Sequence, residues 1–155
     1  LKQDTTENRD GMDLALVVID PKRKILEYSG AKNPLVYIKN KEMFFIKGDN
    51  NPIGGMPNKD ITYQHNEIEI DSPITCYLFS DGFIDQFGGP DGRKFMIKKF
   101  RELLFEIHDR TFEEQKEILD LTIEGWRGDK YSQVDDILVI GFKIDPASFT
   151  TNEVV

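Results

Sequence analysis

Two acidic motifs lie beside the most apolar stretches of the chain. Asp81 comes two residues after the run Ile74–Phe79, and Asp135-Asp136 directly precedes the run Ile137–Phe142. If these runs form neighbouring antiparallel strands, the end of the first meets the start of the second, and Asp81 and Asp135 converge at one edge of the sheet. Carboxylates that lie so close repel each other, and a hard cation such as Mg²⁺ or Mn²⁺ offsets that repulsion. The placement therefore predicts a divalent-cation site.

Both motifs also have a simpler explanation. Asp81-Gly82 is a common turn dipeptide, and acidic residues that precede a strand are usually solvated. A β-rich structural module whose acids are only turn residues is therefore an alternative, and it predicts that metal ions leave the stability of the chain unchanged. The position of both motifs beside the two most apolar strands favours the cation site.

The first half of the chain reads as a series of strands separated by turns. The continuous apolar run Leu14–Ile19 predicts a strand that is covered on both faces. Ile25–Tyr28 alternates and predicts its hairpin partner. Further strands are predicted at Leu35–Ile38, Met43–Ile46 and Tyr63–Ile70, with a loop over Gly48–Gly55.

The second half changes to the spacing of a helix. The apolar residues of Met96–Ile107 predict one amphipathic helix. Thr111, with Glu114 three residues later, predicts a capping box at the start of a second helix that reaches Trp126. Ile137–Phe142 then predicts a last buried strand. Many strands, two helices and a final strand predict an α+β fold with helices packed on a mostly antiparallel sheet.

Composition limits the partners. The chain has 155 residues and a formal net charge of -8, which argues against binding to nucleic acid or to an anionic membrane surface. No apolar stretch approaches the roughly 18 residues that are needed to span a bilayer. Its single cysteine, Cys76, is expected to be a small buried hydrophobe, and one cysteine forms no internal disulfide, which favours a cytoplasmic location.

The chain reads as one domain with short ends. Residues 1–10 form a polar lead-in that starts with Leu1 rather than Met, as expected of a piece of a longer protein. Residues 11–145 carry all the predicted elements. Residues 146–155 are expected to form a disordered or weakly docked tail.

Four motifs in order resemble those of a known family. Leu78–Gln86 and Gln133–Ile140 look like the C-terminal signature of the sporulation protein E-type (SpoIIE-like) phosphatases, the bacterial branch of the protein phosphatase 2C-like (PPM) family. Ser29–Pro34 resembles the family's Ala-Gly-His-Asn-Pro loop, and Pro52–Gly55 resembles its downstream Pro-Ile/Leu-Gly turn. The resemblance extends from Asp10 to Lys143.

This resemblance implies a fold and an activity. The fold is an α-β-β-α sandwich, of which this chain is a C-terminal part with two C-terminal helices on one face of the sheet. The activity is that of a serine/threonine protein phosphatase, in which two Mn²⁺ or Mg²⁺ ions activate a bridging water for attack on the phosphoester. The implied partners are a phosphorylated protein of the anti-sigma-factor antagonist type and an upstream sensor region in the same protein. A homo-oligomer is also expected, because a partial sandwich would expose a sheet edge or an apolar face.

The resemblance also implies roles for six residues, and no catalytic group is expected beyond the metal ligands. The roles are metal ligation by Asp81 and Asp135, support of a ligand by Asp136 and Gly82, and a possible substrate loop at Lys32 and Asn33.

The chain departs from the family pattern in two places. Lys32 stands where the family has a histidine, although a lysine also attracts phosphate. The upstream Asp-x-x-Gly-His-Gly motif, which carries the aspartate that bridges both metals, has no match in this sequence. We therefore expect at most one half of the two-metal site here and weak or no activity from the isolated chain. A non-catalytic regulatory or protein-binding module is the alternative.

Three other features are expected to be structural. His65 lies on a polar alternating strand, and His108 lies at a helix end where a cation offsets the terminal carbonyls. Gly88–Arg93 lacks the lysine and hydroxyl of a phosphate-binding loop and is expected to be a connecting turn.

Overall fold

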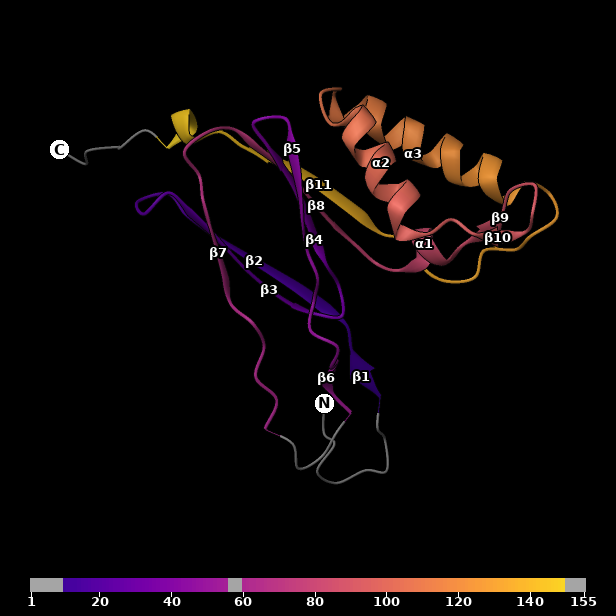
Figure 1. Ribbon diagram of the computed structural model, residues 1–155, viewed down its shortest axis with the longest axis horizontal. Coiled ribbons are helices and arrows are strands. Elements are labelled where there is room, and N and C mark those ends of the chain that lie inside the picture. Colours follow the sequence, from indigo (N-terminus) through magenta and orange to yellow (C-terminus); the bar gives the residue numbers. More distant parts are fainter. Residues whose placement is uncertain (1–9, 56–59, 150–155) are drawn as a thin grey trace. The chain divides into compact units, whose positions relative to one another are not determined.

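A computed structural model describes residues 10–55 and 60–149 (Figure 1). They form two compact units. Among the described residues, the first unit comprises residues 10–55, 60–78 and 142–149, and the second comprises Phe79–Gly141. The polar lead-in, apart from Asp10, and the tail from Thr150 lie outside the described residues.

Two sheets supply the core of the first unit. A three-stranded sheet has the order β2-β3-β7, and a four-stranded sheet has the order β11-β8-β4-β5. The strands are β2 (Leu14–Asp20), β3 (Ile25–Ala31), β4 (Leu35–Lys39), β5 (Glu42–Ile46), β7 (Asn66–Glu69), β8 (Ile74–Phe79) and β11 (Val139–Ile144). The buried residues of both sheets pack into one cluster of Leu26, Tyr28, Leu35, Ile68, Ile70, Ile74, Cys76 and Ile144. The predicted hairpins β2–β3 and β4–β5 are both antiparallel.

β8 is the interior strand that its sequence predicts. It lies between β11 and β4, and every residue except Leu78 is buried. Burial raises the pKa of the Cys76 thiol to about 12, so this side chain stays a neutral hydrophobe, as expected.

β2 differs from its prediction. It lies at the end of the three-stranded sheet, and its side chains alternate between two different environments. Ala15 and Val17 pack against the core, whereas Leu16 and Val18 are 53% and 47% exposed. The prediction that both faces are covered is wrong, because within the described residues only one face of this strand packs on the core.

β11 is also more exposed than expected. The strand begins at Val139 rather than Ile137 and lies at the end of its sheet. Leu138 and Ile140 are 56% and 46% exposed. The run therefore forms an end strand that is buried only in part, with Ile144 at 5% exposure and Ile140 at 46%.

The second unit contains the helices. They are α1 (Gly82–Asp85), α2 (Ile97–Ile107) and α3 (Phe112–Arg127). Buried Phe100, Leu104 and Ile107 follow the helical spacing of α2, which confirms the predicted amphipathic helix. The capping box predicted for α3 is present: the side chain of Thr111 accepts from the backbone of Glu114, and the Glu114 carboxylate accepts from the Thr111 N–H.

Aromatic side chains form the centre of the second unit. Phe83 lies between Phe95 and Phe100, with ring centroids 5.1 Å and 4.5 Å away. Phe79, the last residue of β8, contacts Phe100, and Phe95 contacts Trp126. The residues on either side of Asp81 are therefore anchored on α2.

Several short elements were not predicted. β1 (Gly11–Met12) pairs with β6 (Ile53–Gly54), and β6 lies within the segment that was expected to be a loop. β9 (Phe87–Gly88) and β10 (Arg93–Lys94) form a hairpin, so the intervening segment is a connecting turn, as expected. A short 3₁₀ helix covers Pro146–Ser148, and Phe149 packs against the core, so the tail is docked up to that residue.

The fold as a whole is mixed. The strands are mostly antiparallel, and helices fill the second unit, which confirms the α+β prediction. In the part of the chain that the structure describes, each helix is too short or too polar to cross a membrane.

Candidate functional site

The two acidic motifs lie side by side in the second unit. Ser80 follows β8 directly, and its N–H donates to the carbonyl of Leu138 (3.0 Å). Its hydroxyl donates to the carbonyl of Asp136 (2.8 Å) and accepts from the N–H of Leu138 (3.0 Å). Because β8 and β11 are neighbours and the end of one meets the start of the other, they run antiparallel. Hydrogen bonds thus join the segment of Asp81 directly to that of Asp136.

Gly82 brings these segments into backbone contact. A Cβ atom at this position would lie 2.4 Å from the carbonyl oxygen of Asp136 and 3.2 Å from that of Asp135. Real Cβ atoms essentially never approach an oxygen as closely as the first of these distances. A side chain here would therefore push Asp81 and the Asp135-Asp136 pair apart.

The carboxylate of Asp135 is oriented by its own backbone. The N–H of Asp136 donates to Asp135 Oδ1 (2.7 Å), and Gln133 Nε2 donates to the Asp135 carbonyl (2.8 Å). Asp81, Asp135 and Asp136 are all exposed. Exposed carboxylate oxygens are the donors that Mg²⁺ and Mn²⁺ take, together with water. The donor set fits one side of a hard-cation site, and a full shell needs ligands from elsewhere.

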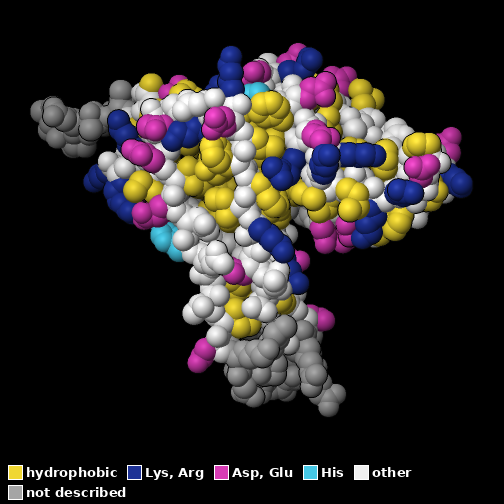
Figure 2. Space-filling view, in the orientation of Figure 1, with side chains coloured by type: hydrophobic (Ala, Val, Ile, Leu, Met, Phe, Trp, Pro, Cys, Tyr) yellow, Lys and Arg dark blue, Asp and Glu magenta, His cyan; other side chains and the backbone are white. Residues whose placement is uncertain are grey.

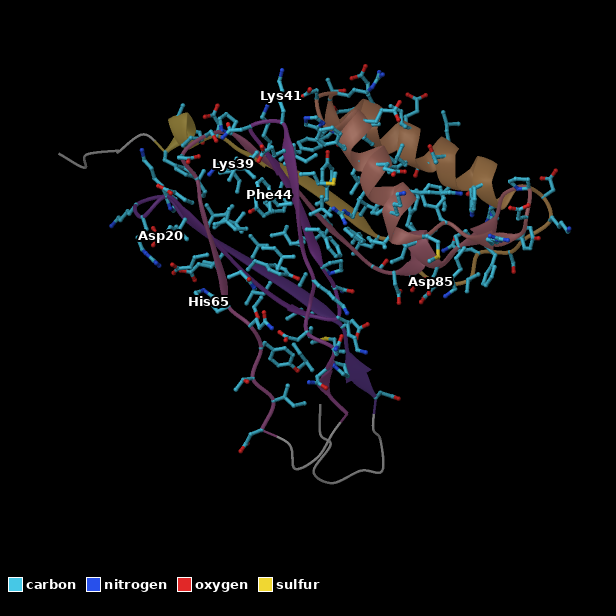
Figure 3. All side chains as sticks on the ribbon, viewed as in Figure 1. Asp20, Lys39, Lys41, Phe44, His65 and Asp85 are labelled. Atoms are coloured by element: carbon cyan, nitrogen blue, oxygen red, sulfur yellow. The ribbon has the colours of Figure 1, made fainter. Side chains whose placement is uncertain are left out.

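Asp85, the remaining acid of this segment, is ion-paired. Lys94 Nζ lies 2.7 Å from Asp85 Oδ2 and ties β10 to α1 (Figure 3). This pairing makes Asp85 a link between two elements of the second unit.

Two residues that hold the site were not singled out from the sequence. Ser80 belongs to the acidic motif, and its hydroxyl was the available signal. Gln86 is fully buried, and its side chain bonds the backbone of Ser132 and Val134. A glutamine next to a phenylalanine carries no sequence signal for such a contact.

The predicted substrate loop lies in the first unit. Lys32 is exposed and has a φ of 69°, a backbone conformation that costs a non-glycine residue about 1 kcal/mol or more. Its N–H donates to the carbonyl of Asp49, and the hydroxyl of Tyr28 donates to the carbonyl of Asn33 (2.6 Å). Burial, with a smaller effect from the Asp49 carboxylate, raises the pKa of Tyr28 to about 12, so the hydroxyl remains a donor.

A pocket borders this loop. Its volume is about 360 Å³. Asp49 lines the pocket, and its carbonyl accepts the hydrogen bond from the N–H of Lys32. The lining residues are Phe45, Ile46, Lys47, Gly48, Asp49, Asn50 and Gln64.

A separate group of charged residues lies on β3 and β7. Glu27 and Glu67 are cross-strand partners, and their ligand atoms lie within 4.8 Å of each other and of His65 (Figure 3). Arg23 bonds both carboxylates at 2.7 Å, and hydrogen bonds to Glu67 and Glu27 raise the pKa of Arg23. His65 therefore lies beside two acids, and Arg23 already forms ion pairs with both of them. Figure 2 likewise shows acidic and basic side chains intermingled on its visible face.

His108 keeps a structural position. It follows α2, and its Nδ1 bonds the carbonyl of Phe105, on whose ring it stacks. This contact lies at the C-terminal end of the helix, where the prediction placed it.

Comparisons with known proteins point to one family. The family model of stage II sporulation protein E (SpoIIE) matches residues 1–145. The SiaA-PP2C domain of Pseudomonas aeruginosa is 32% identical, with a TM-score of 0.77 over 86% of this chain and 52% of that one. The phosphatase domain of the cell fate determinant SpoIIE from Bacillus subtilis shares the fold, with 13% identity and a TM-score of 0.62 over 86% and 58%. No curated protein matches the sequence. The chain thus spans little more than half of the length of these solved structures.

Proposed function

Because the chain belongs to the stage II sporulation protein E family of PP2C-like phosphatase domains, we propose that it is the C-terminal part of a metal-dependent phosphatase acting on phosphoserine and phosphothreonine in proteins. The observation that carries this proposal is the direct joining of the segments of Asp81 and Asp135-Asp136 through Ser80. Their exposed carboxylates provide hard oxygen donors for Mn²⁺ or Mg²⁺.

In this proposal Asp81 and Asp135 hold one cation. Two such ions supply an activated water in a two-metal site. Asp136 fits a supporting role, because its N–H orients the carboxylate of Asp135 at 2.7 Å. Gly82 supports the ligands by allowing the two segments to touch.

The proposed substrate is a phosphorylated protein. Lys32 is exposed next to the pocket at Asp49 and supplies a positive charge for a phosphate group. With Asn33 it forms the proposed substrate loop. A substrate of the anti-sigma-factor antagonist type and an upstream sensor region complete the proposal and rest on the family alone. A cytoplasmic location is proposed from the single cysteine. A homo-oligomer is proposed from the exposed side chains of Leu16 and Val18.

The isolated chain is proposed to be weak or inactive. A two-metal mechanism holds its ions about 3.5–4 Å apart and needs ligands for both. The motif that carries the bridging aspartate has no match in this sequence, and the chain spans about half of its structural relatives. The same facts favour the second candidate, a non-catalytic regulatory or protein-binding module.

Phosphatase assays with Mn²⁺ on a phosphopeptide test the proposal in the full-length protein. Asp81→Asn and Asp135→Asn are each expected to nearly abolish turnover, because each removes a negative ligand. Asp136→Asn keeps the backbone N–H that bonds Asp135 and removes only the charge beside the ligands, so it is expected to cost less, about 10- to 100-fold. Asp120→Asn, at an exposed position on α3, is the matched control and is expected to be neutral.

Three outcomes would contradict the proposal. Full activity in all three variants would remove the metal role of these acids. A loss in Asp136→Asn as large as that in Asp135→Asn, with folding intact, would contradict the assignment of Asp135 rather than Asp136 as the ligand. Robust turnover by residues 1–155 alone would contradict the half-site.

A further inference from the structure

The acids Asp135 and Asp136 lie on a segment without regular structure. Residues 131–138, between α3 and β11, form neither helix nor strand, and Val134, Asp135 and Asp136 are exposed. Such a segment lacks a hydrogen-bond ladder of its own, so other groups must fix its conformation. The position of its carboxylates depends on those groups.

Two side chains from the segment of Asp81 supply these bonds. Gln86 Nε2 donates to the carbonyl of Ser132 (3.0 Å), and Gln86 Oε1 accepts from the N–H of Val134 (3.3 Å). The Ser80 hydroxyl donates to the carbonyl of Asp136 (2.8 Å) and accepts from the N–H of Leu138 (3.0 Å).

The spacing of these bonds is regular. They fall on every second residue from Ser132 to Leu138 and alternate between carbonyl and N–H. An extended strand presents its polar groups to one neighbour with the same period. The side chains of Ser80 and Gln86 thus take the place of a neighbouring strand.

Gln86 is itself held rigidly. Its side chain is 0% exposed, and the second hydrogen of its amide group serves the carbonyl of Phe87 (3.0 Å). The backbone carbonyl of Gln86 accepts hydrogen bonds from Trp126 Nε1 (3.1 Å) and from the N–H of Phe95 (3.0 Å). A buried amide with every donor bonded has one orientation, because any rotation leaves a polar group unpaired.

We propose that Gln86 and Ser80 are positioning residues that set the register of Asp135 and Asp136 against Asp81, so that the affinity of the site for its cation depends on them. The cation itself rests on the proposed function. The four hydrogen bonds from Gln86 and Ser80 to residues 132–138, which we call the clamp, do not rest on the proposed function and can be measured without metal.

Amide hydrogen exchange on this chain and Mn²⁺ calorimetry on the full-length protein test the proposal. Gln86→Met is expected to speed exchange at Val134 and to weaken Mn²⁺ binding by about 10- to 100-fold, the usual effect of losing a group that orients a ligand. Ser80→Ala is expected to speed exchange at Leu138 and to weaken binding likewise. Ser80→Thr keeps the hydroxyl and is expected to restore both.

Gln115→Met is the matched control. Gln115 is 3% exposed in the same unit, and its Nε2 donates to the carbonyls of His108 and Arg110, between α2 and α3. This variant is expected to lose stability as Gln86→Met does, yet to leave exchange at Val134 and the Mn²⁺ affinity unchanged.

The results separate this proposal from the proposed function. Unchanged exchange at Val134 in Gln86→Met and at Leu138 in Ser80→Ala would overturn the clamp. Faster exchange in these variants, combined with a Mn²⁺ affinity equal to that of the Gln115→Met control, would overturn the positioning role. If the unaltered full-length protein binds no Mn²⁺, the proposed function fails at this site, and exchange alone decides the clamp. If Gln86→Met does not fold, the Ser80→Ala and Ser80→Thr pair decides.

Discussion

The contact between Gly82 and Asp136 predicts that Gly82→Ala destabilises the chain, although alanine is the better helix former. The new Cβ would lie 2.4 Å from a backbone oxygen, so the two backbones must separate by about 1 Å to reach the ordinary contact distance of 3.4 Å. No rotamer change relieves a clash between backbones. Overpacking of this kind costs about 1–3 kcal/mol, and the backbone clash places it near the upper end.

A gain partly offsets this cost. Alanine stabilises a helical position by about 1 kcal/mol relative to glycine. We therefore expect a net loss of about 2 kcal/mol in the free energy of unfolding. Gly125→Ala provides the matched control, because Gly125 lies inside α3 with nothing within 4 Å of its added Cβ. That substitution is expected to stabilise the chain by about 0.5–1 kcal/mol.

Urea denaturation of the two variants and the parent measures both effects. The difference between the variants has a sign that no general property of alanine explains, so it isolates the contact at Asp136. Mn²⁺ calorimetry on the same two variants of the full-length protein is expected to show weaker binding in Gly82→Ala alone, because the displaced segment carries Asp135. Equal stabilisation by both substitutions, with unchanged Mn²⁺ affinity, would refute the reasoning.

Three further predictions follow from other positions. Met96 has φ 74° and ψ 145°, a strained backbone conformation that glycine adopts at little cost. Met96→Gly is therefore expected to raise the free energy of unfolding by about 1 kcal/mol in urea titrations. A lower free energy of unfolding in this variant would show that the backbone of Met96 is not strained. Bonds from the backbone N–H and then the hydroxyl of Thr111 lower the pKa of Glu114, so its contribution to stability is present above the ordinary value of 4.5 and is lost as pH falls through the lowered one. Unfolding titrations against pH are expected to show this loss in the parent and not in Glu114→Gln, and parallel curves would contradict it. Leu16 and Val18 are exposed on an end strand and therefore predict self-association of the chain, which sedimentation should detect. The double variant Leu16→Thr/Val18→Thr is expected to associate less. A parent chain that stays monomeric at high concentration would count against this prediction.

Local features of the fold were readable from the sequence. The capping box at Thr111 and Glu114 depends on two residues three apart, and the face of α2 depends on spacing within one helix. Such patterns are set by neighbours in the chain, so one sequence suffices to predict them. The hairpin of β2 and β3 belongs to the same class.

Burial of the end strands was not readable. Leu14–Asp20 and Val139–Ile144 are apolar enough for interior strands, yet both lie at the ends of their sheets in the described residues. An apolar run shows that a strand forms, whereas the cover on each face is set by elements far away in the chain. The exposed side chains of Leu16 and Ile140 are the visible result.

The candidate site divides in the same way. The cation site proposed at Asp81 and Asp135 was predicted from two features of the sequence, the place of these acids beside apolar strands and the family motifs that contain them. Their geometry depends on Gln86 and Ser80, whose bonds cross 46 to 58 positions of the sequence. A neutral polar side chain has no preferred partner until the fold buries it, and burial then makes its bonds obligatory. For this reason the placement of the acids depends on Gln86, a residue of the same motif whose side-chain contacts only the fold reveals.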